Sequence, residues 1–145
     1  MALWRLYYHI VWATKDRHPW ITPAAEPGLY GHIRWKTDEL GGIPHAVGGI
    51  EDHVHLIASI PPKLAVADFI GQIKGSSSHW LNHQGQLEIK FAWQRGYGVF
   101  SISQKNVAEA IKYVLNQKEH HRTGKLIPAL ERVSMDEDGS TLESI

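Results

Sequence analysis

The sequence predicts an α+β domain of the ferredoxin-like type, an antiparallel sheet with helices packed on one face. Predicted elements follow one another in the order strand, helix, strand, strand, helix, strand, helix. A length of 145 residues is typical of one domain and is sufficient to bury a core without disulfides. The composition, 43% apolar and 21% charged, is that of a globular protein rather than a disordered chain.

The first half of the chain contains three predicted strands and one helix. Residues Leu3 to Ala13 alternate aromatic and aliphatic side chains and have almost no turn formers, which is typical of a strand. A helix is predicted over Glu26 to Leu40, because a glycine pair follows its apolar pattern. Two further strands, Ile43 to Ile50 and His53 to Ile60, are joined by a tight acidic turn.

The second half adds two helices and one strand. The apolar spacing predicts a helix over Leu64 to His83, and Tyr97 to Ile102 is predicted as a short strand. A last helix is predicted over Asn106 to Arg122. Asn106 is expected to cap it, because Glu109 stands three residues on, as in a capping box.

The charges are unevenly distributed along the chain. Fifteen basic and fifteen acidic side chains give a formal net charge of zero, which by itself argues against a nucleic-acid partner. Residues 131–145, however, hold five acids and one base, a sum of −4, so residues 1–130 hold 14 bases and 10 acids, a sum of +4. We therefore predict a domain over residues 1–130 and an acidic C-terminal tail over residues 131–145.

Several classes of protein are excluded by composition. The chain has no cysteine, and therefore no disulfide, no thiolate metal site and no cysteine nucleophile. Its longest apolar runs fall far short of the ~20 residues that span a bilayer. The first residues lack the basic start and long apolar stretch of a signal peptide. We therefore expect a cytoplasmic protein that does not insert into a membrane.

His53 and His55 are the first candidates for chemistry. On a strand both side chains point to one face, with Cα atoms roughly 6.7 Å apart. Two neutral imidazoles at this spacing can bind one metal ion if other groups orient them. The alternative is an exposed pair without a role, which arises often by chance among ten histidines. The pair alone favours that alternative.

The last predicted helix carries a second candidate group. Its apolar stripe is expected to face the sheet and consists of Val107, Ala110, Ile111, Val114 and Leu115. On the same projection Tyr113, Gln117 and His120 share the opposite face, with Tyr113 and Gln117 one turn apart. Tyr113 is then either an exposed or dimer-contact tyrosine, which is commoner, or a nucleophile beside an amide metal ligand.

Several segments taken together resemble one family of enzymes. The run His53-Val54-His55 matches the histidine–hydrophobic–histidine signature of the HUH endonuclease superfamily. Other segments resemble the single-tyrosine transposases of small bacterial insertion sequences. These segments are Val11–Arg17, Ile73–Ser78, Trp93–Ser103, Tyr113–Gln117 and Glu119–Arg122. The resemblance covers roughly residues 1–125 and extends to transposases associated with palindromic repeats in bacterial genomes.

The resemblance implies a catalytic mechanism. Tyr113, on the C-terminal helix, matches the nucleophile, and His53, His55 and Gln117 match three ligands of Mg²⁺ or Mn²⁺. The expected enzyme is a transposase that cleaves and rejoins single-stranded DNA through a 5′-phosphotyrosine link, acting as endonuclease and ligase without a nucleotide cofactor. Because a phenol has a pKa near 10, a proton acceptor is expected near Tyr113, and His120 is one candidate.

The resemblance also implies partners. The expected substrate is single-stranded DNA with a hairpin near each end of a mobile element, in the nucleoid of a bacterium or archaeon. Lys15, Arg17, Lys74 and Arg95 are the positions expected to bind phosphates. Family members usually act as homodimers, although the palindromic-repeat relatives act as monomers.

Two other functions stay open at this point. One is a non-catalytic nucleic-acid-binding module on the same fold, and the other is a metal-dependent phosphohydrolase that uses water as its nucleophile. The position of the Tyr113 hydroxyl relative to the histidine pair distinguishes these possibilities from a transposase.

Overall fold

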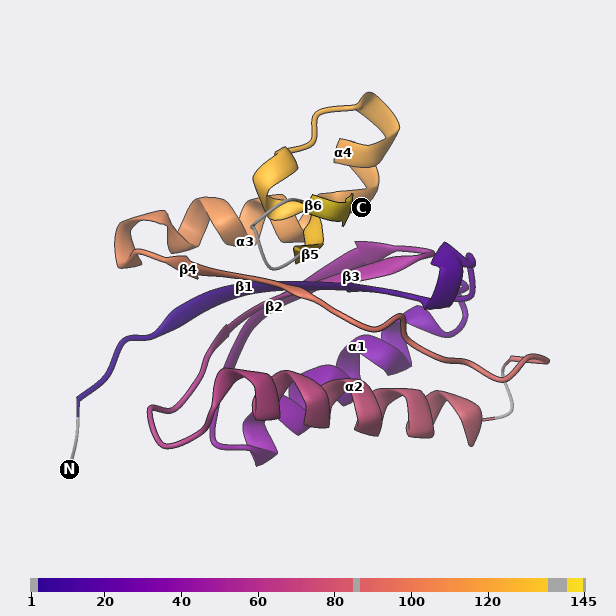
Figure 1. Ribbon diagram of the computed structural model, residues 1–145, viewed down its shortest axis with the longest axis horizontal. Coiled ribbons are helices and arrows are strands. Elements are labelled where there is room, and N and C mark those ends of the chain that lie inside the picture. The colour runs from indigo at the N-terminus through magenta and orange to yellow at the C-terminus, as the bar shows by residue number, and fades with distance from the viewer. Residues whose placement is uncertain (1–2, 85–86, 136–140, 145) are drawn as a thin grey trace.

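A four-stranded antiparallel sheet forms the centre of the computed structural model, which describes residues 3–84, 87–135 and 141–144 (Figure 1). Its strands are β1 (Tyr7–Ala13), β2 (Ile43–Ile50), β3 (His53–Ser59) and β4 (Gly98–Ile102), arranged in the spatial order β2-β3-β1-β4. A second, two-stranded sheet pairs β5 (Arg132–Met135) with β6 (Thr141–Ser144). The order of elements and the antiparallel pairing confirm the predicted ferredoxin-like α+β fold.

Helices cover both faces of the central sheet. The long helices α1 (Glu26–Glu39) and α2 (Val66–Asn82) pack together on one face, as predicted (Figure 1). The C-terminal helices α3 (Val107–Leu115) and α4 (Gln117–Thr123) lie on the other face. Three short 3₁₀ turns complete the pattern and are η1 (Lys15–Arg17), η2 (Gln104–Asn106) and η3 (Pro128–Leu130). Within the described ranges, no helix is long and apolar enough to cross a membrane.

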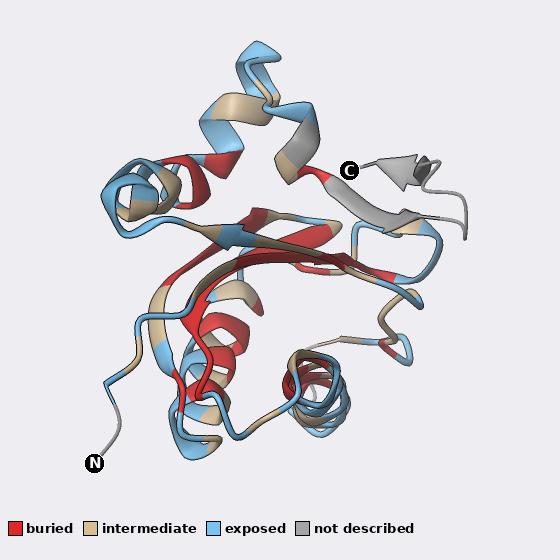
Figure 2. Ribbon diagram, turned by 60° about the vertical axis from the view of Figure 1, so that its left-hand side comes forward, coloured by how far each residue is buried: buried red, intermediate tan, exposed pale blue. Residues whose placement is uncertain are grey.

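The side chains of the sheet alternate between two different environments. On the face toward α1 and α2, Ile10, Trp12 and Leu56 are fully buried in the main core, together with Leu29 of α1 and Phe69 of α2. The face toward α3 has only a small apolar cluster and carries polar side chains as well. Because both faces are covered, every residue of β3 is buried (Figure 2).

The last helix differs from its prediction. Instead of one helix over Asn106 to Arg122, the chain breaks at Asn116 (φ −105°, ψ 25°) and restarts as α4. Asn106 ends the η2 turn with near-helical dihedrals (φ −100°, ψ −2°), and its side chain makes no capping hydrogen bond. The predicted capping box is therefore wrong, because an N-cap residue needs an extended backbone to reach the free N–H groups.

Helix α3 approaches the sheet most closely at Gly48 of β2. A Cβ atom built on Gly48 would lie 2.0 Å from the carbonyl oxygen of Val114. No residue with a side chain fits at this distance, so the absence of a Cβ allows the helix backbone to contact the strand. Val114 is the neighbour of Tyr113, and Gly48 pairs with His55 across the sheet.

We expect Gly48→Ala to lower the free energy of unfolding by about 1–3 kcal/mol, because α3 must move to accommodate the methyl group. Urea denaturation followed by circular dichroism measures this change. The matched control is Gly71→Ala in α2, where no heavy atom lies within 4 Å of the added Cβ and helix propensity raises stability slightly. Equal stability of Gly48→Ala and the wild type would contradict this role for Gly48.

Candidate active site

His53 and His55 project from β3 toward α3 and α4, on one face as their spacing predicts. In the sheet register His55 lies between Val11 and Gly48, and His53 lies between Ala13 and Ile50. Their ring centroids are 5.0 Å apart, and neither residue is exposed. The alternative of an exposed histidine pair is therefore wrong, because the C-terminal helices cover this face.

Each ring nitrogen of His53 has a neighbour. Nδ1 lies 2.8 Å from the Asp52 carboxylate and so donates to it, which leaves the Nε2 lone pair facing the site. Nε2 lies 3.1 Å from Gln117 Oε1 and 3.2 Å from His121 Nε2. Burial opposes the charge of Asp52, but the hydrogen bond from His53 and nearby positive charge, including that of Arg17, outweigh it, so the pKa of Asp52 lies below its usual value.

His55 is held between another histidine and a carboxylate. Its Nδ1 lies 2.7 Å from His9 Nε2, and its Nε2 lies 3.0 Å from Glu131 Oε2. Neither His55 Nε2 nor Glu131 Oε2 makes a hydrogen bond, although both are buried. Burial and the neighbouring imidazoles lower the pKa of His55 well below its usual value, and burial followed by the proximity of His55 lowers the pKa of His9 to about 3. Both rings are therefore neutral near pH 7.

Tyr113 lies inside this site, and its prediction on the outer face of the helix is wrong. Tyr113 is 5% exposed and Gln117 1% exposed, whereas Leu115 of the predicted apolar stripe is 60% exposed. Ala110, Tyr113, Val114 and Gln117 instead form the inner face, at spacings of three, four and seven residues. The phenol of Tyr113 and the amide of Gln117 can face the sheet because each has a polar partner there, Glu131 and His53 respectively.

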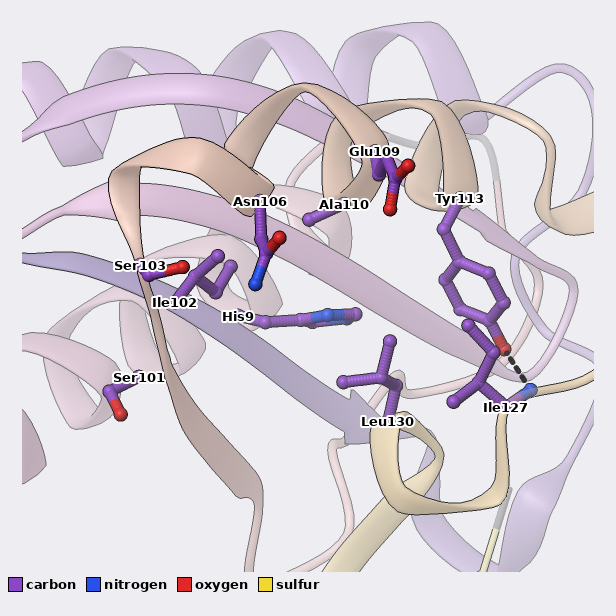
Figure 3. A pocket seen from close by; sticks show the side chains of 10 residues that line it. All are labelled: His9, Ser101, Ile102, Ser103, Asn106, Glu109, Ala110, Tyr113, Ile127 and Leu130. Carbon is purple, nitrogen blue, oxygen red and sulfur yellow. Dashed lines mark hydrogen bonds between the residues drawn. The ribbon is translucent and has the colours of Figure 1, made fainter.

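The Tyr113 hydroxyl makes two hydrogen bonds. It donates to Glu131 Oε1 at 2.5 Å. It also accepts the backbone N–H of Ile127 at 3.0 Å, the contact drawn as a dashed line in Figure 3. Burial and then the bond to Glu131 raise the pKa of Tyr113 to about 12. His120 stacks on the ring of Tyr113, with centroids 4.7 Å apart. The group at the hydroxyl is therefore Glu131 rather than the predicted His120.

Glu131 and His121 were not found by sequence reasoning. Glu131 follows η3 and is 1% exposed. The charge pattern of the sequence instead assigns it to the acidic tail. The spacing of residues in the sequence gives no signal for it, because the chain must fold back to bring it to β3. His121 lies four residues after Gln117, and its Nε2 is 3.1 Å from Gln117 Oε1. That spacing of one helical turn could have indicated that His121 lies beside Gln117. Tail residues Asp136, Glu137 and Asp138 lie outside the described residues.

The donor set fits a divalent cation. One ligand atom each from His53, His55 and Glu131 lies within 4.8 Å of the others, and Gln117 Oε1 lies beside His53. The unpaired His55 Nε2 and Glu131 Oε2 are what a metal between them would bind. Asp52 and His9 contact the outer nitrogens of the two imidazoles, as groups around metal-ligating histidines commonly do.

A pocket of about 270 Å³ opens beside this cluster (Figure 3). His9 and Tyr113 form part of its wall, with Asn106 and Ala110 from the start of the α3 region and Ile127 from the segment after α4. The pocket lets solvent or a ligand reach the edge of Tyr113.

The four predicted phosphate-binding cations lie near one end of β1. Lys15 and Arg17 are in η1, whose backbone contacts the segment before β4 through Lys15 N–H and the Ala92 carbonyl at 3.0 Å. Lys74 donates to the carbonyls of Gln94 and Gly96 at 2.8 and 2.9 Å, which ties this segment to α2. Lys15 and Arg95 are exposed and Arg17 is half-buried, so these three remain available at the surface.

Asp16 and Arg17 have positive φ angles of 53° and 58°, a conformation that is costly for residues with side chains. The same turn lies next to His53, because Ala13 pairs with His53 and Thr14 N–H donates to the Asp52 carbonyl. We call Lys15, Arg17 and Arg95 the cationic edge, and the turn that holds Lys15 and Arg17 lies beside His53.

The sequence matches one family over most of its length. Residues 2–117 match the family model described as "Transposase IS200 like". The transposase for insertion sequence element IS200 of Salmonella typhimurium is 32% identical over 131 residues, which cover 84% of this chain and 83% of that relative. The ISDra2 transposase TnpA of Deinococcus radiodurans is 28% identical over 122 residues, covering 81% of this chain and 87% of that one.

Two solved structures share the fold. A crystallised protein of Deinococcus radiodurans R1, described as a transposase, superposes with a TM-score of 0.63 at 27% identity and covers 80% of this chain and 93% of its own. A REP-associated tyrosine transposase bound to a REP hairpin gives a TM-score of 0.61 and covers 89% and 78% of the two chains. The second is 14% identical and shows the fold alone. The family match ends at Gln117, so Glu131 lies beyond it.

We expect Glu131→Gln to lower the pKa of Tyr113 from about 12 toward its ordinary value of 10.0. The raised pKa reflects stabilisation of the neutral phenol, part of which comes from the bond to the carboxylate, so removing that negative charge favours the phenolate. ¹³C NMR of labelled tyrosine Cζ between pH 8 and 11, without metal, measures the ionisation, and Tyr113→Phe assigns the signal. Tyr30, whose pKa burial also raises, is the internal control, and its signal should be the same in both proteins over this pH range. An unchanged Tyr113 titration would contradict the role given to Glu131.

Proposed function

The chain belongs to the IS200-like transposase family, and from that premise we propose that it cleaves and rejoins single-stranded DNA through a covalent bond to Tyr113. One observation carries the proposal. The Tyr113 hydroxyl and the His55 imidazole of the same chain meet the two oxygens of one carboxylate, at 2.5 and 3.0 Å. A nucleophile and a candidate metal site are thus close enough to act on one phosphate.

Tyr113 attacks the scissile phosphorus in this proposal. A bond forms between the phenolic oxygen and phosphorus while the bond from phosphorus to the 3′-oxygen breaks, giving a 5′-phosphotyrosine and a free 3′-hydroxyl. Glu131 Oε1 is placed to take the phenolic proton, and the leaving 3′-oxygen takes up a proton. Attack by another 3′-hydroxyl reverses these changes and joins new ends. The carboxylate occupies the space between Tyr113 and His55, so it shifts when the phosphate enters.

His53, His55 and Gln117, with Glu131, are the residues that would hold Mg²⁺ or Mn²⁺. When bound, such an ion supplies a Lewis acid that polarises the phosphate and offsets charge in the transition state. The chain's own residues orient this set, because the Asp52 carboxylate accepts a hydrogen bond from the outer nitrogen of His53.

Single-stranded DNA with a hairpin is the proposed substrate, and the cytoplasm is the proposed location. Lys15 and Arg95 are exposed and Arg17 is half-buried, so these three are suited to bind the phosphates of the DNA, whereas the contacts of Lys74 support a structural role. Arg17 lies close enough to Asp52 to help lower its pKa. The homodimer implied by the resemblance stays a prediction. In the described part of the chain, Tyr113 and the histidines meet without a second subunit.

Covalent capture of DNA tests the proposed reaction. With Mn²⁺ and a labelled single-stranded hairpin substrate, we expect the wild type to give a protein–DNA adduct that resists denaturation. Tyr113→Phe should form none, and His53→Ala should lower adduct formation by about 100-fold or more, a factor typical of losing transition-state stabilisation of ~3 kcal/mol. Tyr97→Phe, a half-buried tyrosine outside the site, is the matched control and keeps wild-type activity.

Two other outcomes of this experiment would overturn the proposal. If DNA is cleaved without forming an adduct, and cleavage persists in Tyr113→Phe, the protein is a phosphohydrolase. Binding without cleavage by the wild type would identify a non-catalytic nucleic-acid-binding module.

The salt dependence of binding tests the cationic edge. Each of Arg17→Gln and Arg95→Gln should weaken single-stranded DNA binding and reduce the slope of log K against log salt by about 0.7, the value for one phosphate contact on a single strand. Fluorescence anisotropy between 50 and 200 mM salt measures this slope. Lys63→Gln is the control, because this exposed lysine follows the opposite end of β3. An unchanged slope in both arginine variants would exclude this edge as the DNA surface.

A further inference from the structure

We propose that His9 is a positioning residue, whose ring holds His55 in the tautomer that leaves Nε2 free to bind a metal. The inference rests on the proposed function, because it requires a metal at His53 and His55. It assigns a role to a buried histidine of β1 that takes no part in the reaction as derived above.

His9 and His55 form a buried, directly bonded pair beneath α3. His9 lies on β1 opposite Ile57 and Phe100 and faces the same side of the sheet as His55. His9 Nε2 and His55 Nδ1 are 2.7 Å apart, the ring centroids are 4.9 Å apart, and neither residue is exposed. The two rings are therefore in direct contact inside the folded domain.

The hydrogen bond has only two possible directions. A neutral imidazole carries one N–H, so either His55 Nδ1 donates to His9 Nε2 or His9 Nε2 donates to His55 Nδ1. In the first case His55 Nε2 presents its lone pair. In the second case that nitrogen carries the proton and cannot ligate. The first arrangement also fits the contact with Glu131, because His55 Nε2 and Glu131 Oε2 lie 3.0 Å apart without the geometry of a hydrogen bond.

The other nitrogen of His9 shows what this arrangement costs. When His9 Nε2 accepts, its Nδ1 carries the proton, and this buried atom has no hydrogen-bond partner within the described chain. The neighbouring rings of Phe100 and Tyr113, with centroids 6.3 Å away, do not satisfy it. The hydrogen bond that His9 makes within the described chain is therefore the one to His55.

The two metal-ligating imidazoles would then be oriented in the same way by different groups. The Asp52 carboxylate accepts from Nδ1 of His53, and the His9 ring accepts from Nδ1 of His55. A partner on the outer nitrogen fixes both the tautomer and the direction of the ring, and its loss typically lowers metal affinity by about 10–100-fold.

Two substitutions at the same position separate the hydrogen bond from packing. His9→Phe keeps an aromatic ring and removes the acceptor, whereas His9→Gln places an amide oxygen near the original Nε2 position. Titration of free Mn²⁺ by electron paramagnetic resonance should show an affinity about 10–100-fold weaker in His9→Phe and within a few-fold of the wild type in His9→Gln. His45→Phe is the matched control, because His45 bonds to Ser59 near the far end of the sheet and should leave affinity unchanged.

A spectroscopic measurement reads the tautomer directly. Long-range ¹H–¹⁵N NMR of the metal-free full chain should show His55 protonated at Nδ1 in the wild type and in His9→Gln. Protonation at Nε2 in the wild type would overturn the inference even where His9→Phe fails to fold.

The controls separate this inference from the proposed function. If the wild type does not bind Mn²⁺, or His55→Ala binds it normally, the metal site itself is wrong. If the wild type binds Mn²⁺, His55→Ala does not, and folded His9→Phe binds as tightly as the wild type, then only the role of His9 is wrong.

Discussion

The contact between α3 and β2 fixes the geometry on which the site depends. The Val114 carbonyl oxygen lies too close to Gly48 for a Cβ atom to fit there, so the backbones of the helix and the strand are in direct contact. Val114 adjoins Tyr113, and Gly48 is the cross-strand partner of His55. A single contact therefore sets the distance between the nucleophile and one metal-ligand candidate, with no flexible side chain between them.

The buried polar groups of this face stabilise one another. His9, His55 and Glu131 are removed from water, and burial of such groups is costly unless they are paired. Neutral imidazoles reduce that cost, and lowered pKa values keep His9 and His55 in this form. The buried carboxylate of Glu131 contacts both the phenol and an imidazole. The cluster thus combines lone pairs and one negative charge, which suits a cation.

The sequence predicts those features that depend on local periodicity. Strand alternation correctly places His53 and His55 on one face, and the apolar patterns locate every element of the central sheet to within a few residues. The helical projection fails for Tyr113, because it assigns Leu115 to the core on polarity alone and does not include the break at Asn116. Glu131 reaches the site through tertiary folding after α4, which no spacing in the sequence encodes. The roles of Tyr113, His53, His55 and Gln117 stay predictions.

The segment after α4 is attached to the rest of the molecule partly through the Tyr113 hydroxyl, which binds both Ile127 and Glu131. An aryl phosphate ester has no proton to donate to Glu131. In the proposed reaction, forming the covalent intermediate therefore removes the proton that anchors Glu131. The Tyr113 oxygen that holds this segment is thus the same atom that would bind DNA, so the covalent step would change how the segment is held.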